Sequence, residues 1–89
     1  MLIKLDNGLE LEMDKELLND MRVLDLMAED DNPTSYPKLV NLIMGKDQKQ
    51  KVYDFISKEN NGRIPIEQFR PIFEELLIKM GEQDKEVKN

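Results

Sequence analysis

Apolar and polar residues alternate over residues 1–13, and a period of two is typical of a β-strand. A two-residue loop at Asn7-Gly8 would place unlike side chains on the same face of a hairpin. A three-residue loop that begins one residue earlier, with Gly8 in the left-handed position of a G1 bulge, pairs Leu5 with Leu9. We favour this register because it gathers five apolar side chains on one face: Ile3, Leu5, Leu9, Leu11 and Met13.

An isolated hairpin is unstable in water, so its apolar face must cover helices or a partner chain. The free edge of its first strand could also pair with a strand of a neighbouring copy and build rings or spirals. This hypothesis defines a candidate self-association edge: Leu2, Ile3, Lys4 and Leu5.

Residues 15–29 are predicted to form a helix that Asp14 caps. At about 100° per residue, one narrow apolar stripe follows this helix. The stripe contains Leu17, Met21, Leu24 and Ala28, and a second apolar patch contains Val23, Leu26 and Met27. Two explanations of the second patch remain open: the hairpin covers it, or it faces another subunit or a client protein.

Pro33 disfavours the helical conformation at the residue before it, so the first helix is expected to end there. A short helix then begins at Ser35 or Tyr36. It is apolar on nearly all sides up to Met44, which predicts the most buried element of the fold. Gly45 is expected to end it.

A third helix is predicted from Asp47 to the turn at Asn60-Asn61-Gly62, with its apolar side chains Val52, Phe55 and Ile56 directed inward. A last helix spans roughly residues 67–80 and ends at Gly81. The sequence therefore predicts a mainly α fold with an N-terminal β-hairpin and about four helices. These elements form one small domain over residues 1–81, followed by a flexible charged tail over residues 82–89.

The segment after Phe55 resembles the helix–loop–helix of a calcium-binding EF-hand, with Gly62 at the pivot of the loop. That twelve-residue loop requires oxygen ligands at its first, third, fifth and seventh positions and a bidentate carboxylate at its twelfth. Ser57 occupies the first position and Gln68 the twelfth, so the strongest ligands are missing. We expect the helix–turn–helix shape without a bound metal.

Composition excludes several classes of function. The 89 residues include 19 acidic and 13 basic side chains, which gives a net charge of −6, and no basic stripe for nucleic acid is present. The absence of cysteine and histidine removes thiol chemistry, thiolate metal sites and the commonest general base. We expect no catalytic residues, no metal, no cofactor and no enzymatic activity. Without a signal or membrane-spanning pattern, the expected location is the cytoplasm, with no membrane partner.

Six methionines in a short chain indicate either flexible core filling or an adaptable surface for apolar peptides. Under the second interpretation, the candidate partner-binding residues lie on the first and last helices. They are Val23, Leu26, Met27, Phe69, Phe73, Leu76 and Met80.

Four segments of the chain resemble a known family. They are IKLDNGLELEMD near the start, the acidic helix NDMRVLDLMAEDDNP, the pair LVNLIMGKDQKQKVYDFI, and the closing helix NGRIPIEQFRPIFEEL. In order and spacing they resemble the tail assembly chaperones of long-tailed bacteriophages and prophages, particularly those of Gram-positive hosts. The likeness covers nearly the whole chain and consists of helix, glycine and apolar spacing.

The resemblance implies a small acidic chaperone in the cytoplasm of the host bacterium, without catalysis. It implies binding to the long helical tape measure protein, which is kept soluble before the major tail protein polymerises around it. It also implies self-association into a homo-oligomer. In that family a longer form, which would engage the major tail protein, often arises by translational frameshifting, and this chain would be the short form.

Two other classes of function remain open. The chain could be a degenerate EF-hand-like module that holds a target helix between its Phe55-bearing and Phe69-bearing helices without calcium. A small enzyme or a regulator of transcription is the weakest alternative. A chaperone predicts oligomers and a long coiled-coil-like client, whereas the module predicts a monomer with a short peptide ligand.

Overall fold

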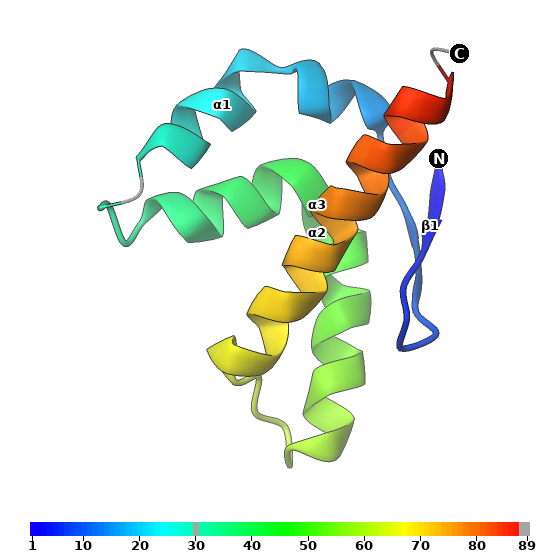
Figure 1. Cartoon of the computed structure of the whole chain (residues 1–89). Helices are drawn as coiled ribbons and strands as arrows, with labels where there is room; N and C mark the ends of the chain where they lie inside the picture. Colours follow the sequence, from blue (N-terminus) through cyan, green and yellow to red (C-terminus); the bar gives the residue numbers. More distant parts are fainter. Residues whose placement is uncertain (30, 88–89) are drawn as a thin grey trace.

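The computed structural model describes the backbone of residues 1–29 and 31–87 and the side chains up to residue 82. The protein is mostly helical and begins with a two-stranded antiparallel hairpin (Figure 1). Strand β1 spans Leu2–Lys4 and strand β2 spans Glu10–Glu12. Three α-helices follow, not about four, because the two predicted middle helices join into one bent element.

The hairpin has the predicted register. Ile3 pairs with Leu11, and the Leu5 amide donates to the Leu9 carbonyl at 2.8 Å. Gly8 has a φ of 95°, as the left-handed end of the three-residue loop requires. The predicted apolar face lies against the helices: four of its side chains are buried and Leu9 is partly buried. The face therefore covers the protein's own core.

Side chains of the helices bind the backbone at both edges of the hairpin. On the β1 side, the Lys79 ammonium donates to the Lys4 carbonyl at 3.0 Å, and the amide of Asp6, in the turn after β1, donates to Glu75 at 2.7 Å. Lys79 also forms ion pairs with Glu75 and Asp6, and hydrogen bonds to these two carboxylates raise the pKa of Lys79. On β2, the Glu12 amide donates to the Gln48 side chain at 3.0 Å.

The predicted helix over residues 15–29 is interrupted. A 3₁₀ helix, η1, spans Lys15–Asn19, and helix α1 spans Met21–Ala28. Between them Asp20 is extended, and its carboxylate accepts from the backbone amide of Arg22 at 2.8 Å, which makes it the N-cap of a new helix. An aspartate that bonds the backbone locally competes with continued helix, and this explains the interruption.

The interruption changes which side of α1 faces the core. Val23 is 2% exposed and Leu26 is partly buried, whereas Met21 and Leu24 of the predicted stripe are 65% and 54% exposed. The predicted stripe was therefore wrong. The prediction assumed one uninterrupted helix from Leu17 onwards. The extended residue between η1 and α1 breaks that helix, so the sides of α1 no longer line up with those of η1.

Helix α2 spans Ser35–Glu59 and bends at Gly45, whose φ of 72° and ψ of 175° are not helical. We call residues 35–44 the first arm and residues 46–59 the second arm. Glycine adopts this backbone conformation without strain, so the predicted end of a helix at Gly45 is present as a bend. The first arm carries the largest share of the buried residues of α2: Ser35, Leu39, Val40, Ile43 and Met44.

Helix α3 spans Ile66–Val87 and packs against α2 (Figure 1). The predicted end of the helix at Gly81 was wrong, because the helix continues through this residue. Glycine lowers helix stability by about 1 kcal/mol but does not stop a helix that packing supports. The backbone of residues 82–87 is therefore helical, and residues 88–89 of the predicted tail lie outside the described residues.

No described helix is both long enough and apolar enough to cross a bilayer. One hydrophobic core joins the hairpin and the helices. The largest fully buried side chains of this core come from the hairpin and from all three α-helices: Ile3, Leu11, Val23, Ile43, Val52, Ile56, Phe73, Leu76 and Met80.

Candidate partner-binding site

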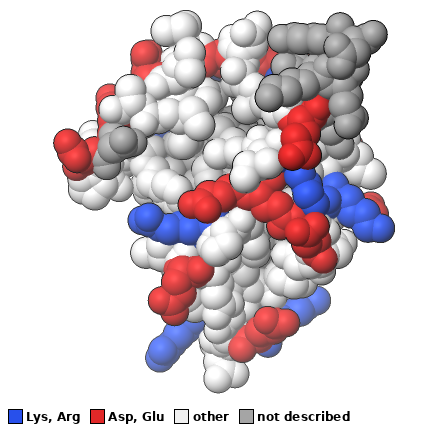
Figure 2. All heavy atoms as spheres, viewed as in Figure 1, with Lys and Arg blue, Asp and Glu red and all other residues white. Residues whose placement is uncertain are grey.

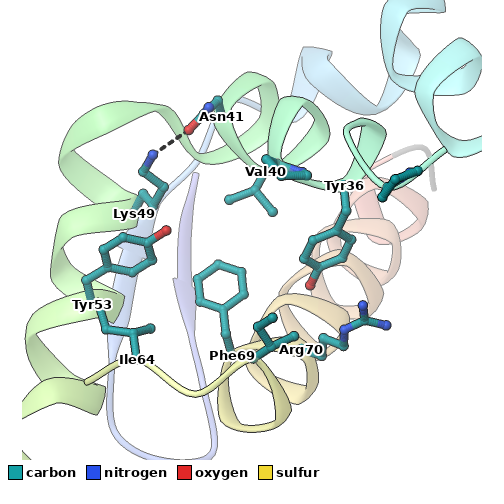
Figure 3. A pocket seen from close by; sticks show the side chains of 11 residues that line it. Tyr36, Val40, Asn41, Lys49, Tyr53, Ile64, Phe69 and Arg70 are labelled. Atoms are coloured by element: carbon teal, nitrogen blue, oxygen red, sulfur yellow. Dashed lines mark hydrogen bonds between the residues drawn. The ribbon is translucent and has the colours of Figure 1, made fainter.

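A pocket of about 260 Å³ lies between the two arms of α2 and the start of α3 (Figure 3). The bend at Gly45 sets the two arms at an angle, and the first turns of α3 close the space between them. Its walls are mainly apolar and aromatic. The lining residues are Pro33, Tyr36, Pro37, Val40, Asn41, Lys49, Tyr53, Ile64, Ile66, Phe69 and Arg70.

Three aromatic rings, each from a different helical segment, form the wall of this pocket. The Phe69 ring of α3 lies with its centroid 6.5 Å from that of Tyr36 and 5.8 Å from that of Tyr53. Both pairs meet edge to face, which is a favourable arrangement of aromatic quadrupoles. Because Phe69 is buried and contacts both tyrosines, it holds the first and second arms of α2 at a fixed separation.

Two cationic side chains stand on opposite sides of the pocket (Figure 3). The Lys49 ammonium lies 5.6 Å from the Tyr53 ring and donates to the Asn41 side chain at 2.6 Å. The Arg70 guanidinium lies 5.1 Å from the Tyr36 ring. These contacts hold each charge over an aromatic face.

The Tyr36 hydroxyl is buried, and its oxygen has no hydrogen-bond partner among the described residues. Burial raises the pKa of this hydroxyl. The Arg70 guanidinium opposes that shift, and the Glu74 carboxylate adds to it. An unsatisfied buried hydroxyl costs about 1–3 kcal/mol. It is therefore a local source of instability beside the pocket.

We expect Tyr36→Phe to raise the free energy of unfolding by about 1 kcal/mol at pH 7, because it removes the unsatisfied group. The gain should increase above pH 10. There the unfolded tyrosine loses its proton before the folded one, so the native protein loses stability as pH rises towards the raised pKa. Urea denaturation at pH 7 and pH 10.5 measures both effects.

Tyr53→Phe is the matched control, because the Tyr53 hydroxyl is not an unsatisfied buried group. Its stability should change by less than about 0.5 kcal/mol. A loss of stability in Tyr36→Phe would show that the Tyr36 hydroxyl has a partner after all.

A second surface is an exposed apolar row on α1, formed by Met21, Leu24 and Met27. Their three-residue spacing places them side by side on the helix, and each is 43–65% exposed. The same helix buries Val23, which lies beside the Met27 end of the row. Helix α1 is therefore apolar both towards the core and towards solvent.

The structure separates the seven candidate partner-binding residues into core and surface. Val23, Phe69, Phe73, Leu76 and Met80 are buried, and of these five only Phe69 lines the pocket. Leu26 is partly buried against the core, and Met27 lies on the exposed row. Helix α1 packs mainly against α2, whereas α3 packs against both α2 and the hairpin, so the sequence alone could not divide these helical faces into core and contact residues.

The candidate self-association edge lies partly against helix α3. Ile3 and Leu5 are core residues, and the Lys4 carbonyl accepts a hydrogen bond from Lys79. The Leu2 side chain is 54% exposed. A neighbouring strand would have to displace the contacts that α3 makes along this edge.

The helix–turn–helix after Phe55 lacks the geometry of a calcium loop. Ser57 still belongs to α2, and the two side-chain amides of Asn60 and Gln68 bond each other at 2.9 and 3.1 Å. Gln68, at the twelfth loop position, therefore closes the turn. Within residues 1–29 and 31–82, no group of three or more acidic side chains is placed to hold a metal ion.

Sequence reasoning missed Tyr36, Lys49, Tyr53 and Arg70 as site residues. They come from three segments far apart in the chain and meet because α2 bends at Gly45. The chain has two tyrosines, and both line the pocket, but nothing in the sequence around them indicated this position. Comparison with protein-family models, curated proteins and solved structures finds no match to this chain.

Proposed function

We propose that this protein is a non-catalytic tail assembly chaperone of the long-tailed phage type. Its client is a tape measure protein, which it keeps soluble in the bacterial cytoplasm during tail assembly. The observation that carries the proposal is the exposed apolar row on α1, together with the resemblance of the sequence. Because α1 already buries Val23, the row is apolar surface that the core does not use.

The row has the chemistry that an apolar helical client requires. Two of its three side chains are methionines, and these unbranched side chains adapt to irregular apolar partners. Clusters of exposed apolar side chains on a small protein are typical of interaction sites. A long client helix could therefore bind α1 along the row.

The charge of the protein suits a coat that must remain dispersed. Acidic side chains lie over α3 and around α1 in Figure 2, with broad uncharged areas between them. A net charge of −6 makes chaperone-coated clients repel one another. The same charge argues against binding to nucleic acid.

The test looks for a long helical reading frame next to the gene of this protein and co-expresses the tagged protein with the product of that frame. We expect the tagged protein to keep that client in the soluble fraction and to recover it on affinity resin. The triple variant Met21→Gln, Leu24→Gln, Met27→Gln should recover about tenfold less client. Loss of apolar burial worth about 1.4 kcal/mol in total is sufficient for a tenfold effect.

The matched control is Ile78→Gln, which removes an apolar side chain of similar exposure from α3. It should recover as much client as the unmodified protein. Full recovery by the triple variant contradicts a role of the row, and no recovery by the unmodified protein contradicts the proposed function. Sedimentation of both variants tests the self-association that the proposal includes.

The alternative function, an EF-hand-like module that binds a target helix without calcium, is favoured by one observation. The pocket lies beside the helix–turn–helix and includes Tyr53 and Phe69 from its two helices and Ile64 from the turn between them. This alternative predicts a monomer that binds one short peptide and leaves a long client insoluble. A calcium titration by calorimetry separates it from a functional EF-hand.

A further inference from the structure

The charge of the pocket is opposite to the charge of the protein. Among its eleven lining residues two are basic, Lys49 and Arg70, and none is acidic. The whole chain has 19 acidic and 13 basic residues. Neither pocket cation forms an ion pair within the described part of the chain. This concentration of positive charge around an apolar cavity identifies the chemistry of a ligand.

The size of the pocket limits what it can hold. About 260 Å³ lies just below the range of roughly 300–1,000 Å³ that is typical of cofactor and small-molecule sites. Aromatic walls from Tyr36, Tyr53 and Phe69 suit one bulky apolar side chain. Ile66, 65% exposed at the rim, extends the apolar surface beyond the cavity.

The two cations flank the position of that side chain. Lys49 belongs to the second arm of α2 and Arg70 to α3, and they stand on opposite sides of the cavity in Figure 3. Their contacts with the Tyr53 and Tyr36 rings keep both cations beside the pocket lining. If the ligand carries a carboxylate on each side of its bulky apolar side chain, one carboxylate would meet Lys49 and the other Arg70. Hydrogen bonds between these opposite charges would favour binding of such a ligand.

We propose that the pocket binds an acidic peptide segment by a single bulky apolar side chain, with flanking carboxylates paired to Lys49 and Arg70. The inference deepens the proposed function, and it rests on that function for the source of the segment, the client protein. The pocket would bind selectively to client segments of this sequence type, whereas the α1 row would cover apolar surface of the client without regard to charge. The overall negative charge repels acidic peptides elsewhere on the protein, so binding would be confined to the pocket.

The chain supplies its own optical probe, because it has no tryptophan and both of its tyrosines line the pocket. The test uses two synthetic 15-residue peptides, each with one central tryptophan in an alanine background. One carries glutamate three and four residues to either side of the tryptophan, and the other carries lysine at these positions. Binding of the tryptophan in the pocket quenches tyrosine emission by energy transfer.

We expect saturable quenching by the glutamate peptide and binding at least tenfold weaker for the lysine peptide. The double variant Lys49→Gln, Arg70→Gln should weaken binding of the glutamate peptide about tenfold and reduce the preference for it. Lys46→Gln, Lys58→Gln is the matched control. It removes the same total charge at exposed positions outside the pocket and should bind like the unmodified protein.

Equal binding of the two peptides, equal weakening by the two double variants, or no tyrosine quenching would each overturn the inference. These outcomes are distinct from failure of the proposed function, because the peptides require no client. A protein that recovers its client through the α1 row but ignores the glutamate peptide refutes the pocket inference alone. A protein that binds the glutamate peptide but recovers no client refutes the chaperone proposal alone.

Discussion

Removal of residues 1–13 is expected to unfold the helical part of the protein. Four side chains of the hairpin, Ile3, Leu5, Leu11 and Met13, are buried in the common core. Burial of each contributes about 1.5–3 kcal/mol, and a domain of this size has a total stability of about 5–15 kcal/mol. The truncated chain should lose its cooperative thermal transition and most of its helical circular dichroism.

A point substitution tests the same packing without a truncation. Ile3→Ala should lower the free energy of unfolding by about 2–5 kcal/mol, because Ile3 is fully buried beneath the helices. The adjacent Leu2→Ala is the control. Its side chain is 54% exposed, so the change should stay within about 0.5 kcal/mol. Equal effects of the two substitutions, measured by urea denaturation, would contradict the packing of the hairpin.

This result also determines how association of the hairpin can be studied. A deletion of the first strand changes the assembly state through loss of the fold, whether or not the edge pairs with a neighbour. The contacts of Lys79 and Glu75 with the edge offer a milder approach. Their replacement exposes the Lys4 carbonyl and the Asp6 amide and leaves the buried face of the hairpin intact.

Gly45→Ala is expected to lower the free energy of unfolding by about 2 kcal/mol. A φ of 72° with a ψ of 175° is a region essentially restricted to glycine, and other residues there are strained by about 1–3 kcal/mol. An added Cβ would meet no atom within 4 Å, so the effect comes from the backbone alone. For a domain of this size the melting temperature should fall by about 8–16 °C.

Gly81→Ala is the matched control and should have the opposite sign. Gly81 is helical within α3, and an added Cβ there also meets no atom within 4 Å. Alanine should stabilise the protein by about 0.5–1 kcal/mol, because it loses less conformational freedom on forming helix. If both substitutions stabilise the protein, α2 does not bend at Gly45 as described.

Several local features could be predicted because neighbouring residues decide them. The register of the hairpin follows from the turn at residues 6–8 and from the alternation on either side of it. The end of α2 follows from Asn60, Asn61 and Gly62, of which the last two have positive φ. The residue preferences of a turn involve only a few neighbouring positions, so turns can be predicted from the sequence.

The interior side of α1 could not be predicted in the same way. Both Asp14 and Asp20 are good N-caps, and the choice of a second cap at Asp20 interrupts the helix and changes its phase. The end of α3 shows the same difficulty. Gly81 has the residue type of a helix end, yet the packing of Leu76 and Met80 against the core supports continued helix.

The candidate site depended most on tertiary structure. The apolar spacing of the last helix identified Phe69 as a candidate contact residue, but it did not reveal the pocket that Phe69 lines. The cations Lys49 and Arg70 look like ordinary solvated residues in the sequence. Their role depends on their position over Tyr53 and Tyr36, which the bend between the two arms of α2 creates.

The sequence by itself determined the hairpin and its register, the turns, the approximate helices, the acidic charge and the lack of thiol and imidazole chemistry. These properties depend on residue identity or on neighbours a few positions away. The tertiary structure alone decided which apolar side chains are core, where α1 faces solvent, and how residues from three segments form a cationic aromatic pocket. Those properties depend on which surfaces meet, and burial is a property of the whole packed chain rather than of any one segment.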